Sequence, residues 1–321
     1  MGQWPRHLAA PAVTGRASPI ATFSGVAMGG GWTLRQPAAV RSGAAEVQAA
    51  LDLVDAQMSA WKPGSALSRL NAAPVGDWMP IPPEMGHVLQ AGLDLMQIAP
   101  GAFSVLMGGA SAAAGFQPGQ PCAPGRDPGV IEVAPGQARR MADVAVDLNA
   151  IAKGFAADLA GHLLVQAGHS DFLIEVAGDI LAKGQRPDGL PWTAAVELPI
   201  PGRSVPARLL PVCDAGLAGS GGYRRARGGV GHILDPATGK PLPATMPSVA
   251  VLARTAMESD GWATVLSVLG PRAGLALAAE RQLPALFISP APDGGGFVET
   301  GSPTMSALLF SDPKGGGSQP D

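Results

Sequence analysis

The stretch DLNAIAKGFAAD, residues 147–158, reads as the end of a strand that runs directly into a helix. The apolar face of this helix is expected to consist of Ile151, Phe155, Leu159 and Leu163. Their spacing of three to four residues predicts a helix that continues to about residue 167. The fold around this stretch therefore combines a strand and a helix in close succession.

Lys153 occupies the first turn of that helix, where the positive end of the helix dipole disfavours a cation by about 0.3–1 kcal/mol. One interpretation is a lysine whose side chain extends into solvent. The other is an anion bound by backbone N–H groups at the helix start, which Lys153 would then face. Gly154 costs about 1 kcal/mol in helix propensity and would let a ligand or a backbone approach closely.

Further along the chain, strands and helices mix without strict alternation. This pattern predicts an α+β fold rather than a doubly wound parallel sheet. We expect helices over residues 44–61, 82–101 and 258–270. We expect strands over residues 25–35, 172–184 (with a tight bend), 190–200, 205–213 and 284–290.

The composition is typical of a globular chain that can build a sizeable core, because 46% of its 321 residues are hydrophobic. The length fits about two domains of ~150 residues, or one large domain with intimate lobes. We expect residues 21–310 to form the folded domain. Residues 1–20 and 311–321 are expected to be disordered, because they are rich in small residues and turn formers.

Charge and targeting signals limit the partners and the location of the chain. The formal net charge is −3 and the main basic run is YRRAR at residues 223–227, so we expect no nucleic-acid partner. The N-terminus lacks the apolar segment of a signal peptide, and the apolar runs look too short to cross a bilayer. Cys122 and Cys213 form no CxxC pair, which fits a reducing compartment. We therefore expect a cytoplasmic protein without a membrane span.

Several common site patterns are missing from the sequence. It contains neither GxGxxG nor a GxxxxGKS or GxxxxGKT loop, which argues against dinucleotide-binding Rossmann and P-loop proteins. It contains no HExxH and its five histidines do not cluster, which argues against a zinc hydrolase. The absence of GxSxG argues against an α/β-hydrolase nucleophile.

Two other segments carry candidate chemistry. Asp260 and Thr264 are four residues apart in a predicted helix, so they share one face and offer two hard oxygen ligands of the kind that Mg²⁺ prefers. A solvated aspartate beside an ordinary helical threonine explains the same spacing. His232 precedes an Asp-Pro turn and could lie near a phosphate or a proton in transfer, or could simply belong to that turn segment.

The order of the motifs is more specific than any one of them. MSAWKPGSALSRLN, GAFSV, VDLNAIAKGFAAD, VAGDI, AGSGGYRR, GHILDPATGKP and ESDGWATVL follow one another along the chain. This order resembles the ApbE family of FAD:protein FMN transferases, from about residue 28 to the C-terminal strands. The most specific pieces are DLxxIAKGxxxD, HxxDP and DxxxT.

The resemblance implies an α+β, ApbE-like fold with two intimate mixed α/β lobes and FAD in a cleft between them. It implies Mg²⁺-dependent cleavage of the FAD pyrophosphate. FMN would pass to a Thr or Ser hydroxyl of an acceptor flavoprotein, and AMP would leave. Phosphoryl transfer of this kind depends on positioning and charge neutralisation more than on covalent catalysis.

Site residues follow from the same resemblance, position by position. The metal ligands would be Asp260, Thr264 and the backbone carbonyl of Ala150. The positions expected to contact FAD are Met28, Trp61, Ala102, Phe103, Ser104, Asp147 and Lys153. His232 would lie near the phosphates, and either His232 or Asp260 could take the proton of the incoming hydroxyl.

The chain departs from the family pattern at three positions. Ser104 replaces a frequent aspartate, and EVAGD replaces NxGGD, which places Glu175 and Ala177 where asparagine and glycine are usual. The added carboxylate and methyl group could alter contacts to adenine or ribose. Two alternatives therefore accompany the transferase hypothesis: a Mg²⁺-dependent FAD pyrophosphatase that yields FMN and AMP, and a non-catalytic FAD-binding protein.

Overall fold

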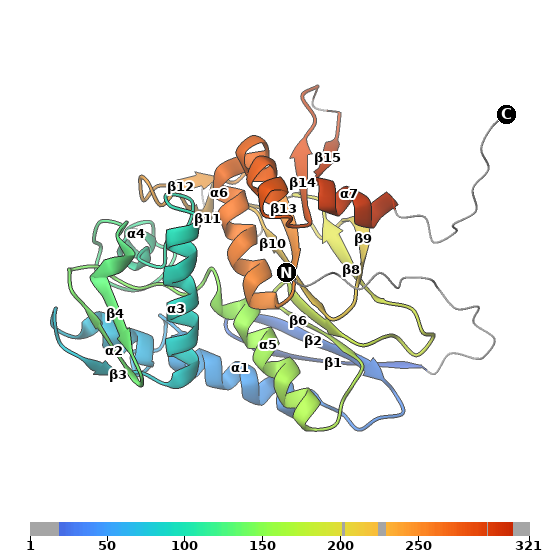
Figure 1. Ribbon diagram of the computed structural model, residues 1–321, viewed down its shortest axis with the longest axis horizontal. Helices are drawn as coiled ribbons and strands as arrows, with labels where there is room; N and C mark the ends of the chain where they lie inside the picture. The colour runs from blue at the N-terminus through green and yellow to red at the C-terminus, as the bar shows by residue number, and fades with distance from the viewer. Residues whose placement is uncertain (1–18, 201–202, 224–228, 294, 311–321) are drawn as a thin grey trace.

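An antiparallel sheet of eight strands forms the centre of the molecule (Figure 1). The computed structural model describes residues 19–200, 203–223, 229–293 and 295–310. In spatial order the strands are β1 (Ile20–Ala27), β2 (Gly30–Pro37), β6 (Phe172–Val176), β7 (Asp179–Lys183), β10 (Ala215–Ser220), β13 (Ser248–Ala253), β14 (Ala285–Pro290) and β15 (Phe297–Gly301). Each neighbouring pair is antiparallel, which confirms the α+β prediction.

Both faces of this sheet are covered, because alternate side chains of each strand point to opposite sides. On one face, Leu34 and Ile174 join the core formed with α1 (Ala44–Met58) and α5 (Ala152–Gln166), and Phe287 packs with α6 (Ala256–Glu280). On the other face, Leu173 and Ile288 pack against the hairpin of β8 (Trp192–Glu197) and β9 (Pro206–Val212) and against α7 (Pro303–Phe310).

The remaining elements extend the helical side of the sheet (Figure 1). They are α2 (Ala66–Ala72), β3 (Met79–Pro80), α3 (Pro83–Ile98), α4 (Gly108–Ala113), the 3₁₀ turn η1 (Pro128–Val130), β4 (Ile131–Ala134), β5 (Gln137–Arg140), β11 (Val230–Leu234) and β12 (Pro241–Pro243). One apolar core runs without interruption from α3 and β4 to α5 and β6. The division into two lobes therefore stays an interpretation of the sequence.

Two tight hairpins bring loop residues to the same region of the sheet. Residues 25–35, predicted as one strand, form a hairpin whose turn consists of Met28 (φ 51°) and Gly29 (φ 72°). The predicted bend within residues 172–184 is confirmed as a turn of Ala177 (φ 51°) and Gly178 (φ 100°). Two successive residues with positive φ match the twist of paired strands, and the single-strand prediction failed because Met28 rarely adopts this conformation.

The first turn of α6 is clamped between α5 and β10. A Cβ atom on Gly154 would lie 2.2 Å from the backbone oxygen of Ala256, and one on Gly216 would lie 2.4 Å from the backbone nitrogen of Ala256. The Asp158 carboxylate accepts hydrogen bonds from the amides of Ala256 (2.8 Å) and Met257 (2.9 Å). Gly154 thus makes room for the backbone of another helix, and the anion at the start of α6 is a side chain of α5.

The predicted apolar face of α5 is confirmed only in part, because Ile151 is buried in the core and the other three residues pack at its edge. Phe155, Leu159 and Leu163 are only half-buried. The buried positions are Ala152, Gly154, Ala156, Ala157, Ala160, Gly161 and Leu164. Small residues dominate this face because neighbouring elements pack closely against α5. Large hydrophobic side chains would not fit in the narrow space between them.

The other boundaries differ from the sequence predictions in smaller ways. Helix α1 ends at Met58 and α3 at Ile98, each three residues early. Ile20, assigned to a disordered N-terminus, begins β1, while residues 1–18 and 311–321 lie outside the described residues. The basic run at residues 223–227 also lies outside them except for Tyr223.

The span of α6 consists of two helical pieces that meet at a kink at Gly270, so the predicted helix end at residue 270 matches the structure. Taken as one piece, it is the one described helix whose length and composition would allow it to cross a membrane. Because the kink divides this stretch into two shorter helices, it does not overturn the expectation that the apolar runs are too short to cross a bilayer. The helix packs on β10 and β13 in the core, contains a non-helical residue at Gly270 (φ 71°), and carries the buried Asp260. We interpret it as a core helix.

Candidate functional site

A cavity of about 730 Å³ opens between the main sheet and the elements around α3 and α4. All of the residues predicted from the sequence line it: Met28, Trp61, Ala102, Phe103, Ser104, Asp147, Ala150, Lys153, His232, Asp260 and Thr264. They come from six separate segments of the chain, and the fold brings them to one place. Their individual roles stay predictions.

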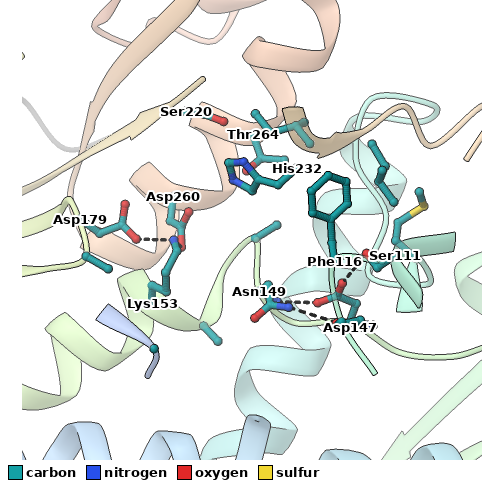
Figure 2. A pocket seen from close by; sticks show the side chains of 18 of the residues that line it. Ser111, Phe116, Asp147, Asn149, Lys153, Asp179, Ser220, His232, Asp260 and Thr264 are labelled. Atoms are coloured by element: carbon teal, nitrogen blue, oxygen red, sulfur yellow. Dashed lines mark hydrogen bonds and ion pairs between the residues drawn. The ribbon is translucent and has the colours of Figure 1, made fainter. Parts of the chain in front are cut away.

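Lys153 is the centre of a buried ion-pair triad at one end of this cavity (Figure 2). Its Nζ lies 2.6 Å from Oδ2 of Asp179 and 3.0 Å from Oδ2 of Asp260. The backbone amide of Gly154 donates a further hydrogen bond to the same Asp260 oxygen at 3.2 Å. Lys153 therefore does not extend into solvent, and its position near a helix start is stabilised by two carboxylates.

The triad contains two carboxylates that compete for one ammonium group. Burial and the neighbouring Asp260 raise the pKa of Asp179 to about 7, and Lys153 only partly opposes this rise. Burial alone would lower the pKa of Lys153, but Asp179 and Asp260 outweigh it and hold that pKa above its usual range. Lys153 stays charged, so its cation is a permanent feature of the cavity wall.

Asp147 and Ser104 also line the cavity, and both make hydrogen bonds within the protein. Asp147 accepts from Ser111 Oγ at 3.0 Å and from the Asn149 amide at 2.9 Å, and burial raises its pKa (Figure 2). Ser104 Oγ donates to the Gly125 carbonyl at 2.9 Å. These bonds fix the loops that shape the cavity, and contact of either residue with FAD stays a prediction.

Much of the remaining lining of the cavity is aromatic and apolar. Trp61 lies at the rim, just after α1, and is 63% exposed. Phe116 and His232 project into the cavity (Figure 2). Further apolar lining comes from Met28, Met58, Phe103, Met107, Tyr223, Leu234 and Val268. A flat aromatic ligand with a charged group at one end would meet matching surroundings in this cavity.

The structure adds residues that sequence reasoning did not assign. Asp179 and Ser220 line the cavity, and Asp179 belongs to the VAGDI motif, so its place directly after a tight turn was a usable signal. Ser220 ends β10 and gave no such signal. Glu175 lines a separate hollow with Ser24 and Glu197, whereas Ala177 lines both that hollow and the main cavity, so the effect of these two departures on ligand contacts stays a prediction.

The oxygen donors at the charged end suit a hard cation. Within the described residues, no group of three His, Cys, Asp or Glu side chains could hold a metal by itself. The predicted donors are one carboxylate (Asp260), one hydroxyl (Thr264) and one backbone carbonyl (Ala150), all of which line the cavity. Such a set fits Mg²⁺, which usually takes few protein ligands and completes its shell with water and phosphate oxygens. It does not fit zinc, which favours nitrogen and sulfur.

Comparisons with known proteins converge on one group. Residues 28–287 match the model of the ApbE family. The FAD:protein FMN transferase of Klebsiella pneumoniae (strain 342) is 30% identical over 327 residues, which cover 92% of each chain. The flavin transferase ApbE from Vibrio cholerae is 30% identical with a TM-score of 0.79, over 91% of this chain and 100% of that one. The apo flavinyl transferase ApbE of Pseudomonas stutzeri is 28% identical with a TM-score of 0.78, over 92% and 98%.

Proposed function

The chain belongs to the ApbE family and is a flavin transferase, and we propose that it moves FMN from FAD to a Thr or Ser hydroxyl of an acceptor flavoprotein, with release of AMP and dependence on Mg²⁺. The observation that carries this proposal is the single cavity that collects all of the predicted site residues. Its apolar rim and its charged end suit the two halves of a flavin nucleotide. The cytoplasmic location expected from the sequence accompanies the proposal as a prediction.

The proposed reaction is one displacement at phosphorus. The acceptor hydroxyl oxygen attacks the phosphorus on the FMN side of the pyrophosphate and forms the new P–O bond. The P–O bond to the bridging oxygen breaks, and AMP leaves with its electron pair. The hydroxyl proton passes to a base, for which His232 and Asp260 are the candidates because both line the cavity. Lys153 contributes a fixed positive charge beside the reacting phosphates.

Asp260, Thr264 and the Ala150 carbonyl would hold Mg²⁺ in this site. When bound, the ion would neutralise charge on the phosphate oxygens and on the leaving group. The chain itself contributes the fixed orientation of Asp260. Its Oδ2 is held by Lys153 and by the Gly154 amide, so the carboxylate cannot rotate freely. A ligand that is fixed before the ion arrives loses little entropy on binding.

Binding of the flavin itself would use the apolar part of the cavity. Trp61 offers an exposed aromatic surface at the rim on which the isoalloxazine ring can stack. The hairpin tip at Met28 also lines the cavity. The cavity volume of about 730 Å³ falls within the range of about 300–1,000 Å³ that is usual for sites of cofactors and drug-sized ligands.

The test is flavinylation in a defined mixture. The protein is incubated with FAD, Mg²⁺ and a candidate acceptor, and covalent FMN is read as in-gel fluorescence of the acceptor. We expect labelling by the wild type, loss of at least about a hundredfold in rate for Asp260→Asn, and no labelling with EDTA. An acceptor whose target Thr is replaced by Val serves as the matched control.

Two outcomes would replace the proposal. Release of free FMN without any acceptor, at a rate that an acceptor does not change, would identify a pyrophosphatase. Tight FAD binding with no turnover in any acceptor mixture, and with no effect of Asp260→Ala on that binding, would identify a non-catalytic FAD-binding protein.

A further inference from the structure

We propose that Asp179 is a positioning residue that acts through Lys153 and keeps the charge of Asp260 available for a divalent cation. The proposal rests on the proposed function, because it takes Asp260 as the carboxylate that meets Mg²⁺. Asp179 is 2% exposed, lines the cavity, and is linked to Asp260 by a shared ammonium group. It is not one of the metal ligands expected from the family resemblance.

The distances show which carboxylate holds the lysine more closely. Lys153 Nζ lies 2.6 Å from Asp179 and 3.0 Å from Asp260, so its shorter contact is with the residue outside the expected metal set. Both contacts use Oδ2, and the Gly154 amide also donates to Oδ2 of Asp260. Asp260 also lines the cavity, so its carboxylate can face a ligand there while Oδ2 is held by Lys153 and Gly154.

The charge balance explains why a second carboxylate is useful. A Lys153–Asp260 pair by itself would be neutral and would attract a cation weakly. With Asp179 ionised, the triad carries one net negative charge, which favours a cation at Asp260 but repels the FAD pyrophosphate until that cation is present. Asp179 therefore couples flavin binding to metal binding through charge alone.

The hairpin between β6 and β7 fixes the position of Asp179 beside Lys153. It is the first residue of β7 and directly follows the Ala177–Gly178 turn. Its Cα partner across the hairpin is Val176, which is buried. A side chain held at the end of a tight hairpin cannot follow Lys153 if the lysine moves, so the ammonium is drawn away from Asp260 and toward the turn.

Two substitutions in the triad should act in opposite directions. FAD affinity is measured by quenching of flavin fluorescence, in EDTA and across a Mg²⁺ titration at one fixed pH. For Asp179→Asn we expect FAD affinity in EDTA to rise by about tenfold. We also expect a rise of about tenfold in the Mg²⁺ concentration that gives half of the maximal change in FAD affinity. For Lys153→Met, which leaves two unpaired carboxylates, we expect both quantities to fall by a similar factor.

A structural role alone would not give this pattern. Asp158→Asn is the control, because Asp158 caps the same helix α6 but does not line the cavity, so it should lower stability and leave the Mg²⁺ titration unchanged. Shifts of the two triad variants in the same direction would overturn the proposal, as would an unchanged titration in Asp179→Asn. If Asp179→Asn fails to fold, Asp179→Ser and Lys153→Met provide the same comparison.

The readouts need no acceptor and no turnover, so failure of the transferase proposal is seen separately. A wild type indifferent to Mg²⁺ would remove the metal from the proposed function and with it the role of Asp179. In EDTA, the opposite shifts of FAD affinity expected for Asp179→Asn and Lys153→Met test the effect of the triad's net charge without any metal.

Discussion

Replacing Gly154 with alanine tests the close crossing between α5 and the first turn of α6. The new Cβ atom would lie 2.2 Å from the Ala256 oxygen and 2.7 Å from the Met257 Cα, so the two helices would have to separate. Overpacking of this kind costs about 1–3 kcal/mol. Alanine adds up to about 1 kcal/mol of helix propensity. Because backbone atoms cannot rotate away as a side chain can, we expect a net loss of about 1–2 kcal/mol in the free energy of unfolding.

Gly86→Ala is the matched control, because Gly86 also lies inside a helix, α3. Its Cβ would meet Ile81 Cδ1 at 3.6 Å, which is an ordinary contact. We expect this variant to gain up to about 1 kcal/mol. Urea unfolding followed by circular dichroism measures both variants at one pH. If Gly154→Ala equals or exceeds the wild type in stability, the close crossing is refuted.

The same shift should disturb the site, because the Gly154 amide donates to Asp260. We expect Gly154→Ala to lose flavin transfer even at temperatures where it is folded, and Gly86→Ala to keep wild-type rates. Equal rates in both variants would mean that the crossing does not position Asp260.

Two further predictions concern the rim and the helix cap. Trp61→Ala should weaken FAD binding by about tenfold, because the stacking surface is lost. It should leave the free energy of unfolding within about 0.5 kcal/mol of the wild-type value, since Trp61 is 63% exposed. Unchanged quenching of flavin fluorescence in this variant would exclude stacking. Burial raises the pKa of Asp158 to about 6, above its unfolded value, so its contribution to stability is greatest at low pH and declines as pH rises from about 4 to 6. The stability advantage of the wild type over Asp158→Asn should therefore be smaller at pH 7 than at pH 4.5 in urea unfolding, and a larger advantage at pH 7 would contradict this sign.

Local patterns in the sequence predicted most elements of the fold but not how they pack. The helix periodicity of residues 44–58 and the bend at Ala177–Gly178 were readable, because each depends on neighbours in the chain. The buried face of α5 was not, since its alanines and glycines are selected by the close approach of α6. Helices α2 and α7 are short and carry weak periodicity, and the sequence did not indicate them.

For the candidate site too, the sequence predicted which residues take part but not how they contact one another. The ordered motifs predicted which residues gather, and the cavity contains them all. The partners of Lys153 could not be predicted, because Asp179 and Asp260 come from distant parts of the chain and meet only in the folded sheet. The sequence showed that a cation at the start of α5 is unfavourable. Only the folded structure shows that Asp179 and Asp260 stabilise this cation, Lys153.

The first turn of α6 packs between Gly154 of α5 and Gly216 of β10, and this packing determines when the site can be completed during folding. During synthesis the chain emerges from the ribosome at about 5–20 residues per second, so α5 and β10 are available before α6 exists. Until α6 docks, the backbone at Gly154 and Gly216 stays uncovered, and Lys153 has Asp179 as its partner but no Asp260. Contacts between segments so far apart in sequence form slowly. Nascent chains that end before residue 256 should therefore lack both Asp260 and the packing that fixes Lys153, so the cavity is completed only after α6 docks.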